Sequence, residues 1–163
     1  MNEDKVQRIV EEVVLRLQRR AQNKIALSAA QLRDTDSRML FSQYGTLCLL
    51  LADLALLKGI AEQDNRNIAA MKIHSALALG LNVQISLRLS LLPSLPVKKL
   101  ARLPLSFCDE NGQAITLHPG QLLSYSDIAR LKHQILVLRR RCIVTALARE
   151  AATVRNIQLI KQE

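Results

Sequence analysis

The chain has 163 residues, of which 49% are hydrophobic and only 2% are aromatic, and it contains no tryptophan. This length suits one globular domain with a core of Leu, Ile, Val and Ala, while the scarcity of rings argues against stacking platforms for single-stranded nucleic acid. The net charge of +9 is compatible with an acidic partner but does not distinguish nucleic acid, anionic lipid and acidic protein.

An amphipathic helix is predicted at the start of the chain, over residues 2–20. Aliphatic residues recur there at the i, i+3, i+4, i+7 spacing of a single helical face. This apolar stripe consists of Val6, Ile9, Val10, Val13, Val14 and Leu17. Asn2 is placed to cap the helix, and Glu3 and Asp4 follow in the first turn, where the helix dipole favours anions. Leu15 points to the opposite face.

Three roles are open for this helix. It packs on its own domain, as most amphipathic helices do, or it is offered to a groove of a partner protein, or it lies on a membrane surface. The membrane role fits least, because the stripe lacks Trp and Phe and the polar side is rich in acidic residues. We interpret the stripe as a partner-binding element.

The stretch after this helix has a loose pattern. Residues 21–45 show no sustained periodicity, and Asp34-Thr35-Asp36-Ser37 is typical of a loop. We therefore interpret the chain as an amphipathic helix at residues 1–20, a partly ordered connector at residues 21–45 and an α/β domain at residues 46–163.

Strands and helices alternate through the remaining chain. Strands are predicted over residues 46–52, 83–89, 134–138 and 157–160, and helices over residues 54–62, 67–79, 124–133 and 145–155. Leu105–Cys108 and Ala114–His118 flank a loop with Asn111-Gly112, which is a hairpin signal. The sequence thus predicts the class α/β, as a layered domain with a mostly parallel sheet plus a hairpin, preceded by the N-terminal amphipathic helix.

The C-terminal part contains two local signals and one ambiguity. Thr145 is expected to cap the helix that follows it. One face of that helix is expected to carry Leu147, Ala148, Ala151 and Val154. Residues 139–144 either continue the preceding strand or form the next one.

No arrangement of residues indicates a catalytic, cofactor-binding or metal site. The glycines match no phosphate-binding pattern, no nucleophile motif occurs, and the cysteines and histidines lack metal-ligand spacing. Cys48, Cys108 and Cys142 are expected to be buried thiols, His74 a packing residue, and Asp109 a solvated residue at the hairpin tip. We therefore predict no enzyme, no cofactor and no metal. The alternative is an α/β ligand- or nucleotide-binding domain with an unrecognised enzymatic role.

Two basic clusters, Lys98-Lys99 and Arg139-Arg140-Arg141, are interpreted as solvated edges. The arginines precede Cys142 and favour a lower thiol pKa, but in a strand they do not all share its face. No recognition helix with base-reading side chains accompanies these clusters, so we predict no nucleic-acid partner. The charged start and the absence of a long apolar run indicate a cytoplasmic protein without a membrane partner.

Several segments resemble the PduM family of propanediol-utilization microcompartment proteins. They are Gln7–Glu12, Val97–Leu105, Cys142–Ala152 and Arg155–Glu163, and the resemblance extends over essentially the whole chain. Residues 1–14 also look like the short encapsulation helices of microcompartment cargo proteins. The resemblance implies a structural protein required for assembly or stability of the bacterial microcompartment for 1,2-propanediol degradation. It implies shell or core proteins of that compartment as partners and the compartment, in the cytoplasm, as the location.

Overall fold

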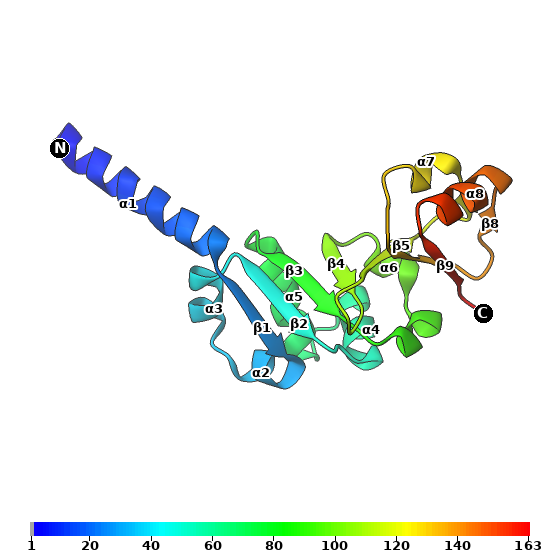
Figure 1. Ribbon diagram of the computed structural model, residues 1–163. Coiled ribbons are helices and arrows are strands. Elements are labelled where there is room, and N and C mark those ends of the chain that lie inside the picture. The colour runs from blue at the N-terminus through cyan, green and yellow to red at the C-terminus, as the bar shows by residue number, and fades with distance from the viewer. Residues whose placement is uncertain (1) are drawn as a thin grey trace.

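The computed structural model describes residues 2–163 and shows a long helix, α1, projecting from an α/β body (Figure 1). The first part of the chain forms α1 (Glu3–Gln22), β1 (Lys24–Ser28), α2 (Ala29–Asp34), α3 (Ser37–Gln43), β2 (Thr46–Leu50), α4 (Leu54–Glu62), α5 (Ile68–Ala78), β3 (Asn82–Ser86), the 3₁₀ helix η1 (Leu89–Ser94), α6 (Val97–Leu100) and β4 (Leu105–Cys108). The second part forms β5 (Ala114–His118), β6 (Leu122–Leu123), α7 (Tyr125–Ile128), β7 (Ile135–Leu138), β8 (Ile143–Val144), α8 (Ala146–Val154) and β9 (Gln158–Lys161).

The main sheet has seven strands in the order β1-β2-β3-β4-β5-β7-β9. Every neighbouring pair is parallel except β4 and β5, which form an antiparallel hairpin. A separate pair, β6 and β8, is also parallel. The predicted fold class, a mostly parallel sheet plus a hairpin behind an N-terminal helix, is confirmed, and the hairpin strands have their predicted bounds.

The hairpin divides the sheet into two halves whose helices lie on opposite faces. Successive strands are added in one lateral direction, and right-handed crossovers therefore keep the helices of the first half on one face. After the hairpin the strands run the opposite way, so the same handedness moves the helices to the other face. The side chains of β7 show this change: Ile135 and Val137 join the core of α4 and α5, whereas Leu136 and Leu138 pack with α7 and α8.

The stretch predicted as a partly ordered connector is instead regular structure, so that prediction was wrong. Residues 21–45 contain β1, α2 and α3, and β1 pairs with β2 as an edge strand of the main sheet. Distant contacts stabilise these short elements. The Nζ of Lys72 in α5 donates to the carbonyls of Leu32 and Arg33, both at 2.8 Å, and of Thr35 at 2.5 Å.

Further differences lie near the ends of predicted elements. The strand expected over residues 83–89 ends at Ser86, and the helix expected over residues 124–133 is limited to α7. Residues 139–142 form a turn, in which the Cys142 amide donates to the Arg139 carbonyl at 3.0 Å, and β8 follows it.

The structure confirms the predicted cap of α8 and shows which residues of this helix are buried. The Thr145 side chain accepts from the Ala148 amide at 3.1 Å, which confirms the predicted cap. Of the four residues predicted to share one face of this helix, Ala148 and Ala151 are buried, whereas Leu147 and Val154 are exposed. The residues of α8 that are buried are Ala148, Ala151 and Ala152.

Candidate functional site

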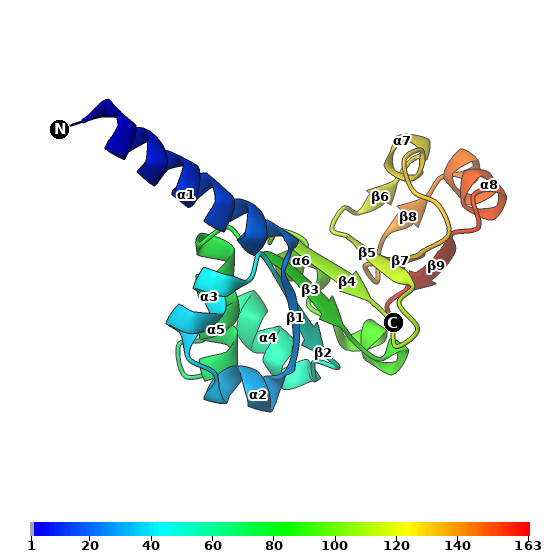
Figure 2. The same cartoon turned by 60° about the vertical axis from the view of Figure 1, so that its left-hand side comes forward.

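The six stripe residues all lie on α1, and none of them is buried. Their exposed fractions range from 40% for Val6 to 59% for Ile9, and no residue of α1 is buried. Figures 1 and 2 both show α1 leading away from the sheet along most of its length. The stripe therefore contacts no core of its own chain within residues 2–163.

The C-terminal end of α1 is fixed to the body. The Arg20 side chain donates to the Phe41 carbonyl at 2.8 Å and to the Leu79 carbonyl at 3.1 Å. Gly45 lies against the same turn, where a Cβ atom would be 2.6 Å from the Arg20 carbonyl oxygen. The direction of the helix is thus set by long-range contacts of Arg20 and Gly45, which helical periodicity does not reveal.

The rest of α1 depends on local interactions. Glu12 and Arg16 form an ion pair at 2.6 Å, and Glu3 and Asp4 occupy the first turn. Asn2 is at the N-cap position but makes no side-chain cap hydrogen bond, so the expected cap by its side chain was wrong. A helix without tertiary packing has marginal stability in water, and an apolar partner surface would stabilise it.

The stripe has the chemistry of a protein-binding helix face. Aliphatic side chains without titratable groups recognise an apolar groove by burial and shape. Leu15, on the far face, is also exposed, at 52%, so exposure alone does not separate it from the stripe. No helix within residues 2–163 is long and apolar enough to cross a membrane.

Cys108 and Cys142 lack the lowered pKa of an activated thiol nucleophile. Burial raises the pKa of Cys142, and the nearby Lys161 and Arg139 lower it by less. Burial and the neighbouring Asp109 also raise the pKa of Cys108. Reactive thiols need a lowered pKa. Of the three thiols expected to be buried, Cys142 is buried, whereas Cys48 and Cys108 are half-buried.

Asp109 and His74 have structural hydrogen bonds. Asp109 is only 4% exposed, and its carboxylate accepts from the amides of Asn111 at 2.9 Å and Gln113 at 2.8 Å. The expectation of a solvated Asp109 was wrong, because the hairpin turn folds back over it. The Nε2 of His74 lies 2.7 Å from the Ile60 carbonyl oxygen. In the part of the chain that the structure describes, no group of three His, Cys, Asp or Glu residues is placed to hold a metal ion.

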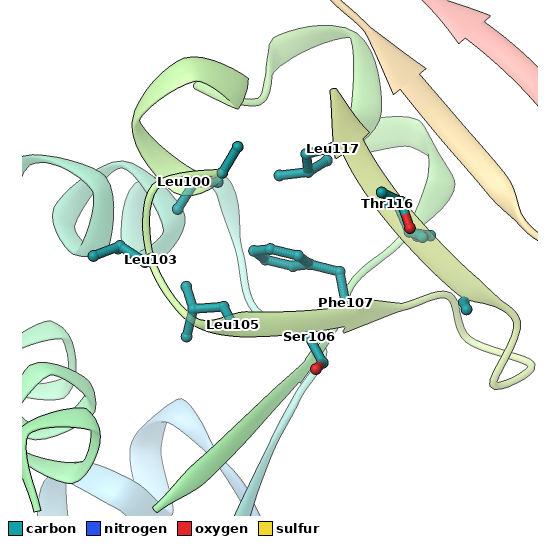
Figure 3. A pocket seen from close by; sticks show the side chains of 10 residues that line it. Leu100, Leu103, Leu105, Ser106, Phe107, Thr116 and Leu117 are labelled. Atoms are coloured by element: carbon teal, nitrogen blue, oxygen red, sulfur yellow. The ribbon is translucent and has the colours of Figure 1, made fainter. Parts of the chain in front are cut away.

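A hollow of about 340 Å³ lies between α6 and the β4–β5 hairpin (Figure 3). The side chains of Leu100, Phe107 and Leu117 point into it, whereas Ser106 and Thr116 point away. Its lining contains no titratable side chain. The hollow thus offers packing surface but no side chain for acid–base chemistry.

Known proteins resemble the chain over its whole length. The family described as "Putative propanediol utilisation" matches residues 8–158. The bacterial microcompartment assembly protein PduM of Citrobacter freundii is 58% identical over 163 residues, which is 100% of each chain. The protein of the same name from Salmonella typhimurium is 56% identical over the same full length. No solved structure matches the chain. The resemblance in the sequence is therefore confirmed, and the chain belongs to the PduM family.

Proposed function

We propose that this protein is a non-enzymatic structural component that supports assembly or stability of the bacterial microcompartment for 1,2-propanediol degradation. The support comes from two relatives named as microcompartment assembly proteins, each more than half identical over the full length. A role without catalysis agrees with the raised pKa values of Cys108 and Cys142 and with a hollow whose lining has no titratable side chain. The protein would accordingly act at the microcompartment, in the cytoplasm.

We further propose that α1 is the element that contacts a shell or core protein. The observation that carries this proposal is a 20-residue helix with six aliphatic residues on one face and no buried residue. Full burial of an aliphatic side chain contributes about 1.5–3 kcal/mol, so the stripe provides a gross gain of order ten kcal/mol. Loss of translational and rotational freedom offsets about 4–15 kcal/mol of such a gain. At most about 6 kcal/mol of that gain remains, so a single helix would bind weakly, with a Kd above about 10 μM, and such affinity suffices where many copies assemble together.

The fixed C-terminal turn of α1 favours its proposed role as a partner-binding helix. Because Arg20 and Gly45 fix the last turn to the body, the 20-residue helix extends about 30 Å from a defined origin, and its stripe covers about 17 Å of that length. A partner groove would order the helix on contact without any change in the core. The binding partner would supply an apolar groove with a polar rim that tolerates the mixed charges on the other side of α1.

A pull-down from cells that express the compartment tests this role. The full chain should recover shell or core proteins, and a chain without residues 1–20 should recover none above background. Equal recovery by both chains would contradict the role of α1.

Two point variants test whether the contact is made by the stripe itself or by the helix in general. Val13→Glu puts a carboxylate into the apolar groove and should reduce recovery by at least tenfold, since burial of an unpaired charge costs several kcal/mol. Leu15→Glu makes the same chemical change on the far face and should leave recovery nearly unchanged. If the two variants behave alike, the stripe is not the contact surface.

A further inference from the structure

A basic hollow lies at the carboxyl ends of the second half of the sheet. β5, β7 and β9 run parallel, so the segments that follow these three strands meet at one edge. They enclose a hollow of about 370 Å³. Its lining consists of Gln121, Arg139, Arg140, Arg141 and Gln162. The carboxyl edge of parallel strands is a frequent ligand position in α/β proteins.

Hydrogen bonds hold the walls of this basic hollow in place. The Arg139 guanidinium donates to the Pro119 carbonyl at 3.0 Å. The Gln162 amide donates to the Leu138 carbonyl at 2.9 Å, and its side-chain nitrogen donates to the carbonyls of Leu92 and Leu95, both at 2.9 Å. These contacts fix one arginine and the opposite wall before any ligand arrives.

Arg140 and Arg141 occupy the centre of a tight turn. The hydrogen bond from the Cys142 amide to the Arg139 carbonyl closes this turn, and both central side chains are exposed. The sequence had suggested a strand here, in which neighbouring arginines point to opposite faces. The turn instead brings all three arginines to the lining of one hollow.

Basic residues outnumber acidic residues in this region of the chain. Residues 119–163 hold eight of the 23 Lys and Arg residues but three of the 14 Asp and Glu residues. Side chains of residues 2–163 form two ion pairs, Arg16–Glu12 and Lys99–Glu62, and neither lies in this region. Lys161 precedes Gln162 and adds a further cation, and the exposed Glu163 is the acidic residue that follows it.

We propose that the basic hollow binds a carboxylate-rich segment of a partner protein. Guanidinium groups form paired hydrogen bonds with carboxylates. The lining holds no glycine-rich loop of the kind that cradles phosphates and no aromatic ring on which a base would stack. Single exposed ion pairs are weak, so binding requires several carboxylates on one segment, and a lone small anion does not suffice.

The position of the basic hollow gives it a role distinct from that of α1. Figures 1 and 2 show the free end of α1 and the C-terminal end of the chain on opposite sides of the body. A protein with an apolar contact at one side and an anion-binding contact at the other links two components. This proposal does not depend on what α1 binds, because its test leaves α1 unchanged.

Binding of a fluorescent hexaglutamate peptide to the full chain at low ionic strength tests the proposal. The double variant Arg140→Gln, Arg141→Gln should raise the Kd by about tenfold, as expected for the loss of two exposed ion pairs. The control Lys58→Gln, Lys98→Gln removes the same charge from exposed positions elsewhere and should leave the Kd nearly unchanged. Both variants should keep the thermal midpoint of the parent, because all four side chains are exposed.

Two results would overturn the proposal. Equal weakening in both double variants would mean that the peptide responds to net charge and not to the basic hollow. Binding of pyrophosphate that depends on Arg140 and Arg141, with no binding of hexaglutamate, would identify a phosphate ligand in place of an acidic protein segment.

Discussion

Helices α1 and α8 are both amphipathic in sequence, but the structure places them in opposite environments. The nine residues of α8 bury Ala148, Ala151 and Ala152 beneath the second half of the sheet. The 20 residues of α1 include six stripe residues and bury none. The apolar face is therefore packed in one helix and exposed in the other, and the place of each helix in the topology decides which.

The topological difference has a simple cause. Helix α8 lies in the crossover from β7 to β9, two parallel neighbours, so the chain must return across the sheet and the helix is pressed against it. Helix α1 precedes β1, which is the first strand within residues 2–163, so α1 does not lie in a crossover between two described strands. Its last turn is fixed to the body by the hydrogen bonds of Arg20 and the close approach of Gly45.

The largest difference in stability is expected when the same substitution, Ile to Ala, is made in the buried helix α5 and in the exposed helix α1. Ile73→Ala in α5 empties a fully buried site and should lower the free energy of unfolding by about 2–5 kcal/mol. Ile9→Ala in α1, where the side chain is 59% exposed, should change it by no more than about 0.5 kcal/mol. Chemical denaturation of both variants measures the difference. A similar loss in the two would mean that α1 packs on the body.

The next effect concerns the stretch that the sequence suggested was a connector. Lys72→Met removes an ammonium group that bonds three carbonyls at the end of α2. It should cost about 1.5–3 kcal/mol, as for other hydrogen bonds to a charged group. Lys58→Met, at an exposed position of α4, is the matched control. Equal denaturation midpoints in the two variants would show that α2 does not need this contact.

A smaller effect on stability is expected from the N-cap residues of α8 and α1, which are Thr145 and Asn2. Thr145→Ala removes the hydroxyl that accepts from the Ala148 amide and should cost about 0.5–2 kcal/mol. Thr145→Ser keeps the oxygen and should retain most of that stability. Asn2→Ala, where no side-chain cap bond exists, should leave the thermal midpoint within error of the parent. An unchanged midpoint for Thr145→Ala would reject the cap.

Local signals in the sequence were enough for much of the fold. The Asn111-Gly112 loop located the hairpin, and Thr145 located the start of α8, because a turn or a cap depends on a few adjacent residues. The connector was misjudged because β1 is an edge strand of five residues and α2 is held by Lys72, 37 to 40 positions further along the chain. Such long-range contacts leave no periodicity in the short segment itself.

For the candidate sites, too, the sequence showed the local pattern but not the long-range arrangement. Helical spacing identified the six residues of the stripe, but it did not determine whether they face the body or solvent. The arginines were visible as a run, yet their common lining of one hollow depends on the turn closed by Arg139 and Cys142. The sequence indicated a strand over residues 139–144, which would have separated these side chains.

One variant, Val10→Glu, tests the central claim that α1 serves a partner and not its own body. Val10 is 54% exposed at the middle of the stripe, so the thermal midpoint of the isolated protein should stay close to that of the parent. In cells that express the compartment, the same variant should lose its co-localisation with it, because the carboxylate blocks an apolar groove. A large fall in the midpoint, or co-localisation equal to that of the parent, would contradict the account.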